Sequence, residues 1–179
     1  LHPFEKKYQR IDWDATAAEK NGYPDFMLKE MYEQPSTVRE TIGTRVTAGA
    51  PTQVDGLDFT AAQLQNLHQI YIIGCGTAMH AGLAAKPMFE HLTHIPTQVD
   101  VASEFRYRDP LVDDRTLCIF ISQSGETADT IAALRLAKAA GAATLAVSNV
   151  IGSSITREAD YTVYTHAGPE IAVASTKAY

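Results

Sequence analysis

The stretch that decides the fold is "FISQSGETADTIAALR", residues 120–135. An apolar, β-prone run leads into it, and a pattern with helical spacing follows. Between the two lie Ser122, Gln123, Ser124 and Thr127, which place three hydroxyl groups and one amide within six residues. The stretch therefore predicts a turn from a strand into a helix that is unusually rich in neutral hydrogen-bonding groups.

The rest of the chain repeats this alternation of strand and helix. Helical patterns over 77–93 and 127–140 separate β-prone runs, and Gly141 stands where a helix C-terminus favours glycine. Five runs are expected to be strands: 69–73, 97–101, 116–121, 143–148 and 161–164. Such alternation favours right-handed crossovers and a parallel sheet with helices on both faces. We expect a three-layer αβα sandwich of the α/β class, with a five-stranded parallel sheet in the flavodoxin-like order 2-1-3-4-5.

The N-terminal part reads differently. Residues 1–22 are polar and mixed in charge, as is typical of a linker. From Pro24 a helical pattern begins, and proline at position 35 predicts a kink or a restart of that helix. One face of this helix carries Phe26, Met27, Met31 and Tyr32. We divide the chain into a linker and helical lead-in, residues 1–48, and an α/β domain, residues 49–179.

Composition narrows the classes of function. The chain has 179 residues, 45% of them apolar, and a net charge of −6, which argues against nucleic acid or an anionic membrane surface as partner. No apolar run is long enough to span a bilayer. Cys75 and Cys118 both lie in apolar runs, which suits reduced thiols in a cytoplasmic protein.

Two polar loops are expected to meet at one edge of the sheet. Open parallel sheets bind ligands beyond the carboxyl ends of their strands, where the strand order reverses. In the order 2-1-3-4-5 this point lies between the loop 74–80, "GCGTAMH", and the loop 122–127, "SQSGET". The sequence therefore predicts a binding site formed by these two loops.

Both loops have the features of an anion cradle. Gly76 and Gly125 allow positive φ or close approach to a ligand, and Thr77 and Thr127 stand about where helix N-caps belong. Helix capping alone is the simpler interpretation of such residues. However, "SQSGET" supplies more hydroxyl groups than one cap can use, which favours a ligand.

Other motifs are weaker or missing. "GCGTAM" is a truncated dinucleotide-binding motif with Met79 in place of the third glycine, so that Asp100 would have to serve as the ribose-binding acid. There is no P-loop, and Ser124 does not lie in G-x-S-x-G. His91 and His94 lack further ligands nearby. We expect no metal and no cofactor, and a dinucleotide site remains a weak alternative.

Five longer stretches carry a family resemblance: "CGTAMHAG", "SEFRYRDP", "ISQSGETADTIAALR", "NVIGSSITREAD" and "GPEIAVASTKAY". Together they resemble the isomerase domain of the glutamine–fructose-6-phosphate aminotransferase family, also called glucosamine-6-phosphate synthases. The segment "IDWDATAAEKNGYPDFMLKEMYEQP" is similar to the linker that precedes this domain. The resemblance implies the SIS (sugar isomerase) fold. Residues 49–179 would be its first lobe, truncated at the C-terminal end.

The resemblance also implies a substrate and its site. Family members convert fructose 6-phosphate and glutamine to glucosamine 6-phosphate and glutamate. By similarity, the substrate-binding residues are Cys75, Gly76, Thr77, Ser122, Gln123, Ser124, Thr127, Val173 and Ser175, with Glu170 and Lys177 at the rim. The resemblance implies that the four residues of the 122–127 loop bind the phosphate and that Thr77, Val173 and Ser175 contact the sugar. Ala78 departs from the family pattern "GTS", which removes one hydroxyl from the phosphate site.

By the same resemblance, we expect the family's catalytic residues to lie in a second SIS lobe and a C-terminal tail, and none of them in this chain. The chain begins at Leu1 without the nucleophilic cysteine of a glutaminase domain, and it ends at Tyr179 within a family motif. We expect a chain that binds the sugar phosphate without catalysis, whose partners are a glutaminase domain, a second SIS lobe and a second copy in a homodimer. A phosphosugar-sensing SIS module is the alternative, although a basic helix-turn-helix, which such sensors carry, is missing from residues 1–50.

Overall fold

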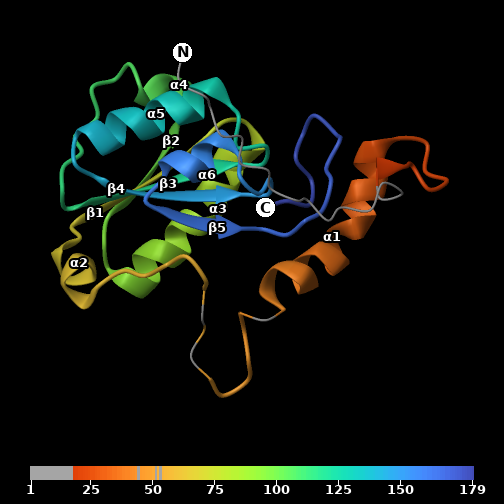
Figure 1. Ribbon diagram of the computed structural model, residues 1–179, viewed down its shortest axis with the longest axis horizontal. Helices are drawn as coiled ribbons and strands as arrows, with labels where there is room; N and C mark the ends of the chain where they lie inside the picture. Colours follow the sequence, from red (N-terminus) through yellow and green to blue (C-terminus); the bar gives the residue numbers. More distant parts are fainter. Residues whose placement is uncertain (1–17, 44, 51, 53) are drawn as a thin grey trace, which may run out of the picture.

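The computed structural model describes residues 18–43, 45–50, 52 and 54–179. Most of the linker expected over residues 1–22 therefore lies outside the described residues. Figure 1 shows a sandwich of helices around a central sheet, with helix α1 standing to one side of it. The C-terminal segment runs between the sheet and α1.

The sheet has the predicted strands and the predicted order. All its pairs are parallel, and the order is β2-β1-β3-β4-β5, which is the flavodoxin-like arrangement. The strands are β1 (Gln69–Gly74), β2 (Thr97–Val101), β3 (Thr116–Ser122), β4 (Ala143–Ser148) and β5 (Tyr161–Tyr164). Every residue of β3 is buried, because this strand lies at the centre of the sheet and is covered on both faces.

Helices cover both faces of the sheet, so the three-layer sandwich is confirmed. Alternate residues of β3 point to opposite faces, as the pleat requires, so Phe120 and Ile119 belong to different apolar clusters. On the Phe120 face lie α4 (Ala102–Phe105), α5 (Ala128–Ala139) and α6 (Ser154–Glu158). On the Ile119 face lie α3 (Thr77–Thr93) and the segment that contains α2 (Ala61–Asn66).

Helix termini follow the local signals of the sequence. Gly141 has a φ of 91°, and the N–H groups of Gly141 and Ala142 donate to the carbonyls of Lys138 and Ala137, which ends α5 in a Schellman motif. The three short helices α2, α4 and α6 were not expected from periodicity. Helix α2 does have a local signal, because Thr60 and Gln63 form a capping box at its start.

Helix α1 (Phe26–Ile42) corrects one expectation. It runs through Pro35 without a break, so the restart expected there is wrong. Several of its apolar side chains face outward, since Met31 is 48% exposed and Tyr32 is 68% exposed, whereas Glu30 and Thr37 are buried. A polar stripe at helical spacing, formed by Glu30, Gln34, Thr37 and Thr41, instead faces the C-terminal segment.

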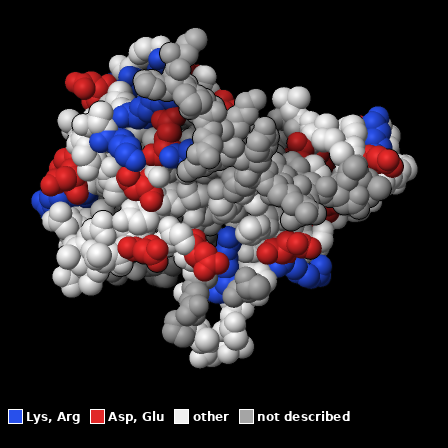
Figure 2. All heavy atoms as spheres, viewed as in Figure 1, with Lys and Arg blue, Asp and Glu red and all other residues white. Residues whose placement is uncertain are grey.

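Charged side chains of both signs mix over the sandwich. Figure 2 shows blue and red side chains side by side over the region of α5 and α6. The ion pairs in this region include Arg135 to Glu158 at 2.6 Å and Lys138 to Asp160 at 2.7 Å. No helix within the described residues is both long enough and apolar enough to cross a bilayer.

Candidate functional site

A cavity of about 180 Å³ opens at the carboxyl ends of β1 and β3. Three segments line it: 75–78 from the start of α3, 121–127 from the turn between β3 and α5, and 170–179 from the C-terminal segment. The two polar loops therefore meet at the strand-order reversal, as the sequence predicted. The third segment, 170–179, brings Val173 and Ser175 of the expected site next to the two loops, although they are distant from both loops in sequence.

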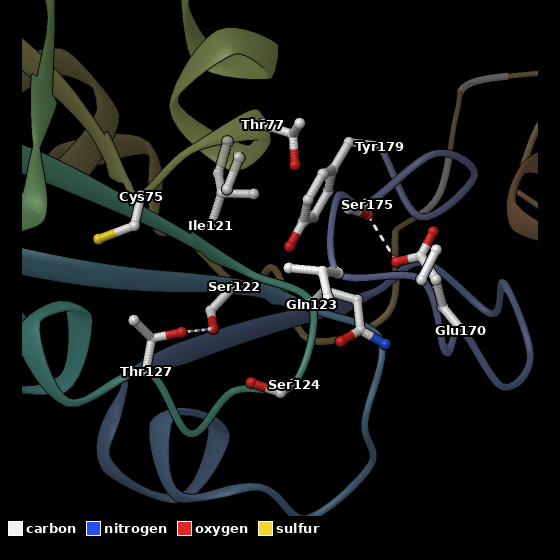
Figure 3. A pocket seen from close by; sticks show the side chains of 13 residues that line it. Cys75, Thr77, Ile121, Ser122, Gln123, Ser124, Thr127, Glu170, Ser175 and Tyr179 are labelled. Atoms are coloured by element: carbon white, nitrogen blue, oxygen red, sulfur yellow. Dashed lines mark hydrogen bonds between the residues drawn. The ribbon is translucent and has the colours of Figure 1, made fainter. Parts of the chain in front are cut away.

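The turn after β3 holds its hydroxyl groups in defined roles. Ser122, at the end of the buried strand, is 3% exposed, and its Oγ accepts the backbone N–H of Gly125 at 3.1 Å. The Oγ atoms of Ser122 and Thr127 lie 3.2 Å apart (Figure 3). Thr127 is the N-cap residue of α5, but its side chain caps no backbone N–H. The capping interpretation therefore does not account for the Thr127 hydroxyl.

Ser124 repeats this arrangement one step further along the turn. Its Oγ accepts the backbone N–H of Glu126 at 3.2 Å. Because a serine hydroxyl has one hydrogen and two lone pairs, a hydroxyl that accepts a turn N–H keeps its own hydrogen for another acceptor. Ser124 can therefore donate to a bound anion, and so can one of the pair Ser122 and Thr127, because their mutual contact uses the hydrogen of only one of them. The N-terminus of α5 adds free backbone N–H groups and the positive end of its dipole.

Gln123 lies between the two serines and ties the turn to the neighbouring strand. Its backbone carbonyl accepts the N–H of Asn149, just beyond β4, at 3.1 Å. Its side-chain amide lies on the side of the turn that faces Glu170 (Figure 3). Gly125 has a φ of 67°, and a Cβ there would lie 2.0 Å from Ser153 Oγ, so this position needs glycine.

The loop after β1 forms the opposite wall. Gly76, with a φ of 58°, is the N-cap of α3, so the expectation that Thr77 would be the cap is wrong. Thr77 is instead the first helical residue, and its hydroxyl points toward Tyr179 in Figure 3. Cys75 and Ala78 also line the cavity, but the Cys75 sulfur lies toward Thr130 Oγ1, at 3.8 Å.

The C-terminal segment closes the cavity without any regular secondary structure. Within it, Glu170 Oε2 accepts the Ser175 hydroxyl at 2.6 Å, and Glu170 Oε1 accepts the N–H groups of Thr176 and Lys177, each at 2.9 Å. The Val173 side chain is fully exposed, so this residue offers mainly its backbone to the cavity.

Lys177 lies elsewhere than the expected rim. Its side chain is 4% exposed, and its Nζ lies 2.6 Å from Glu33 Oε2 on α1. It lines a different hollow, between α1 and the end of the chain. The amine of Lys177 is therefore committed to α1 and is not among the groups that face the cavity.

Tyr179 is a lining residue that the sequence analysis missed. Burial, and next the negative charge of Glu170, raise the pKa of its phenol, so the hydroxyl stays protonated near neutral pH. Ile121 and Ala172 were missed as well. Ile121 had a signal, because it immediately precedes Ser122 in a predicted strand. Tyr179 and Ala172 had none, because the path of the C-terminal segment has no periodicity to read.

The electrostatics of the cavity are those of neutral donors. Among the described residues that line it, none is a lysine or arginine, and Glu170 is the one carboxylate. Hydrogen bonds from its own segment satisfy both oxygens of Glu170. Hydroxyls, backbone N–H groups and a helix N-terminus can hold an anion of phosphate size without a cationic side chain.

Asp100, the acid that a dinucleotide site would need, already has hydrogen-bonding partners within the protein. Asp100 Oδ2 pairs with Arg108 Nη1 at 2.9 Å, and its Oδ1 accepts the backbone N–H of Val101. In the fold, Gly82 rather than Met79 supplies the close helix–sheet approach, since a Cβ there would lie 2.8 Å from Ile72 Cγ2.

The fold and the site together match one domain family. The SIS domain matches residues 63–179, so the chain belongs to the SIS domain family. Within that family it is similar to glutamine–fructose-6-phosphate aminotransferases (isomerizing). It is 58% identical over 175 residues to the enzyme of Clostridium acetobutylicum, which covers 98% of this chain and 29% of that relative. It is 51% identical over 177 residues to that of Streptomyces coelicolor, covering 99% and 29%.

Solved structures agree with this result. The C-terminal domain of the glucosamine-fructose-6-phosphate aminotransferase from Francisella tularensis superposes with a TM-score of 0.79 at 43% identity, covering 90% of this chain and 45% of that one. Glucosamine-6-phosphate deaminase from Thermotoga maritima has a TM-score of 0.65 at 20% identity, covering 85% and 43%, and shares the fold. The chain spans about 29% of the length of the curated relatives it matches.

Proposed function

We propose that this chain is the sugar-phosphate-binding part of an enzyme that makes glucosamine 6-phosphate from fructose 6-phosphate and glutamine. The observation that carries the proposal is the set of hydroxyls at 122–127. Ser122 and Ser124 each accept a turn N–H, and Thr127 has no capping role. Ser124 and one of the pair Ser122 and Thr127 therefore keep a hydrogen for the phosphate. The similarity to the aminotransferases supports the identity of the sugar.

The ligand would lie across the cavity with its two ends on different segments. The phosphate would contact the turn 122–127 and the N-terminus of α5. The sugar would extend toward Thr77 on one wall and toward Val173 and Ser175 on the other. Because Ser175 donates its hydrogen to Glu170, its oxygen would accept a hydrogen bond from a sugar hydroxyl.

The wider assignment rests on the relatives. Since they are more than three times as long as the chain, we infer that catalysis needs further segments: a glutaminase domain and a second SIS lobe. We propose a cytoplasmic, homodimeric enzyme as the setting. The chain by itself is expected to bind fructose 6-phosphate without forming glucosamine 6-phosphate.

A binding experiment tests the proposal. We would titrate the chain with fructose 6-phosphate, fructose and inorganic phosphate in a calorimeter, and repeat the titrations with Ser122→Ala. A hydrogen bond to a charged group contributes about 1.5–3 kcal/mol, so the variant should lose roughly 10- to 100-fold in affinity for fructose 6-phosphate. The affinity for unphosphorylated fructose should stay unchanged.

Thr93→Ala is the matched control. The Thr93 hydroxyl also accepts a turn N–H, from Ile95 at 3.1 Å, but it lies at the other end of α3 from the cavity. This variant should bind fructose 6-phosphate as the parent chain does. Equal affinity of the parent chain and a folded Ser122→Ala variant for fructose 6-phosphate would refute the phosphate site.

A further inference from the structure

The carboxylate of Glu30, on α1, is buried although α1 lies outside the sandwich. The residue is 2% exposed, and within the described part of the chain its hydrogen bonds go to a segment that begins 141 residues further along. Its Oε1 accepts the backbone N–H of Ile171 at 2.6 Å and that of Ala172 at 3.1 Å. Its Oε2 accepts the Ala172 N–H at 3.3 Å and the Thr176 hydroxyl at 3.4 Å. A buried carboxylate is costly unless it is hydrogen-bonded, so its partners must stay in place.

Two carboxylates therefore define the shape of one irregular loop. Glu30 holds the N–H groups of Ile171 and Ala172, where the loop enters the cavity. Glu170 holds the N–H groups of Thr176 and Lys177, where the loop leaves it. No helix or strand fixes the residues between these anchor points. These intervening residues include Val173 and Ser175, which line the cavity.

Among the described residues, the hydrogen bonds of Glu30 reach one of the two halves of the site. Its contacts end at the C-terminal loop, and none of them reaches the turn 122–127, which is anchored by β3, α5 and the Asn149 N–H. A change at Glu30 should therefore move the wall that faces the sugar and leave the wall that faces the phosphate in place.

We propose that Glu30 is a positioning residue for sugar recognition, which acts through the backbone of Ile171 and Ala172 on Val173 and Ser175. The inference rests on the proposed function, because it assigns the loop 170–176 to the sugar and the turn 122–127 to the phosphate. It places part of the specificity of the site on the helix that precedes the sandwich.

The test compares Glu30→Gln with Glu40→Gln. Glutamine at 30 keeps one acceptor oxygen but turns the other into an N–H₂ donor that faces the donors of Ala172 and Thr176. Glu40 is an exposed acid on the same helix, so Glu40→Gln removes the same charge without touching the loop. Each protein would be titrated with fructose 6-phosphate and with inorganic phosphate, after its fold has been checked by circular dichroism.

Glu30→Gln should weaken fructose 6-phosphate binding by about tenfold, the effect of losing about one hydrogen bond to a charged group. Its affinity for inorganic phosphate should stay within about twofold of the parent chain, and Glu40→Gln should match the parent chain with both ligands. Amide hydrogen exchange should also become faster at Ile171 and Ala172 in Glu30→Gln only.

Two outcomes would overturn the inference. Unchanged binding of fructose 6-phosphate by Glu30→Gln would show that the loop does not depend on Glu30, and an equal loss for both ligands would show a general structural role. If Glu30→Gln fails to fold, Glu30→Asp serves as the second variant. Its side chain keeps the charge but is one methylene shorter, and it must lose affinity for fructose 6-phosphate while keeping that for inorganic phosphate. If the parent chain binds inorganic phosphate but not fructose 6-phosphate, or binds neither, the proposed function itself fails.

Discussion

The Oγ atoms of Ser122 and Thr127 lie 3.2 Å apart across the turn that joins β3 to α5. This contact couples the last residue of the central strand to the first residue outside the helix. The Thr127 side chain caps no N–H of α5, and the contact with Ser122 uses the hydrogen of one of the two hydroxyls, so the other hydroxyl keeps its hydrogen for a ligand. The contact holds the two hydroxyls on the same side of the turn, as a single phosphate would require.

Thr127→Val should separate binding from stability. Valine keeps the shape of threonine but removes the hydroxyl, so affinity for fructose 6-phosphate should fall about tenfold. The melting temperature should fall by no more than about 4 °C, because the variant loses the contact with Ser122 Oγ but no cap hydrogen bond. Thr127→Ser, which keeps the hydroxyl, should bind nearly as the parent chain does. Full affinity in Thr127→Val would remove this hydroxyl from the phosphate site.

Gly125→Ala should destabilise the fold more than Gly76→Ala does. Both glycines have positive φ, and alanine costs about 1 kcal/mol or more in such a conformation. At Gly125, however, the new Cβ would also lie 2.0 Å from Ser153 Oγ, whereas at Gly76 nothing lies within 4 Å. Urea unfolding of the two variants measures the difference, which we expect to be about 1 kcal/mol or more.

A second substitution shows whether the contact with Ser153 is the cause. Ser153→Gly removes the two nearest atoms from the path of the new Cβ, so Gly125→Ala combined with Ser153→Gly should regain part of the lost stability. A double variant that is additive in its losses would contradict this explanation.

The sequence was informative wherever periodicity or glycine marks the backbone. Strand–helix alternation predicted the parallel sheet, and the meeting of the loops around Gly76 and Gly125 followed once the flavodoxin-like order was taken, which the structure confirms. The assignment of the hydroxyls at Ser122 and Thr127 to a phosphate stays a prediction. The hydrogen bonds of these hydroxyls could be read only from the structure. The same holds for the start of α3, where a shift of one residue decides whether Gly76 or Thr77 is the N-cap.

The role of α1 could not be predicted from its pattern. Met31 and Tyr32 suggested an apolar face, and apolar faces of helices usually pack inward. Here the helix contacts an irregular loop whose exposed groups are backbone N–H and C=O, so polar side chains such as Glu30 and Thr37 are the ones that are buried. Residues 165–179 have neither helical nor strand spacing, so their sequence gives no indication that they pack against the polar residues of α1.

The two thiols should differ sharply in reactivity. Cys118 is fully buried in β3, and burial raises its pKa to about 12, so almost no thiolate forms at pH 8. Cys75 is partly exposed and lines the cavity. A maleimide reagent at pH 8 should therefore label one thiol per folded chain, with Cys75→Ser as the control that abolishes labelling.

Ligand should protect the reactive thiol. Fructose 6-phosphate bound in the cavity should slow labelling of Cys75, whereas fructose should have no effect at the same concentration. Labelling of Cys118 at a similar rate in the folded chain, which peptide mass analysis would detect, would contradict the burial of β3.

Lowering the pH should weaken the attachment of α1 to the C-terminal segment, because it protonates Glu33, which pairs with Lys177. Burial raises the pKa of this carboxyl, but the hydrogen bond and the charge of Lys177, and then those of Lys29, outweigh it and hold the pKa below its usual value. A carboxyl whose pKa is lower in the folded state adds stability above its unfolded value, about pH 4.3, and loses it as the pH falls through the folded value.

Glu33→Gln isolates this contribution. The parent chain should be more stable than the variant at pH 7, and the difference in the free energy of unfolding should shrink as the pH falls from about 5 to 3. Other carboxyls with lowered pKa values, such as Glu158 and Asp160, are common to both proteins and cancel in the difference. A difference that stays constant over this range would show that the Glu33 ion pairs do not contribute.

The way α1 holds the C-terminal loop has a consequence for how such a site can diverge. Glu30 binds the main chain of Ile171 and Ala172, and Thr37 donates to the main-chain carbonyl of Lys177. Main-chain groups are the same for almost every amino acid, so substitutions at Ile171 or Val173 leave these anchor points in place. The loop can therefore acquire new side chains where it lines the cavity, as at Ala172, while the helix that shapes it needs no compensating change. If the cavity binds a sugar phosphate as proposed, such changes would alter the preference for the sugar.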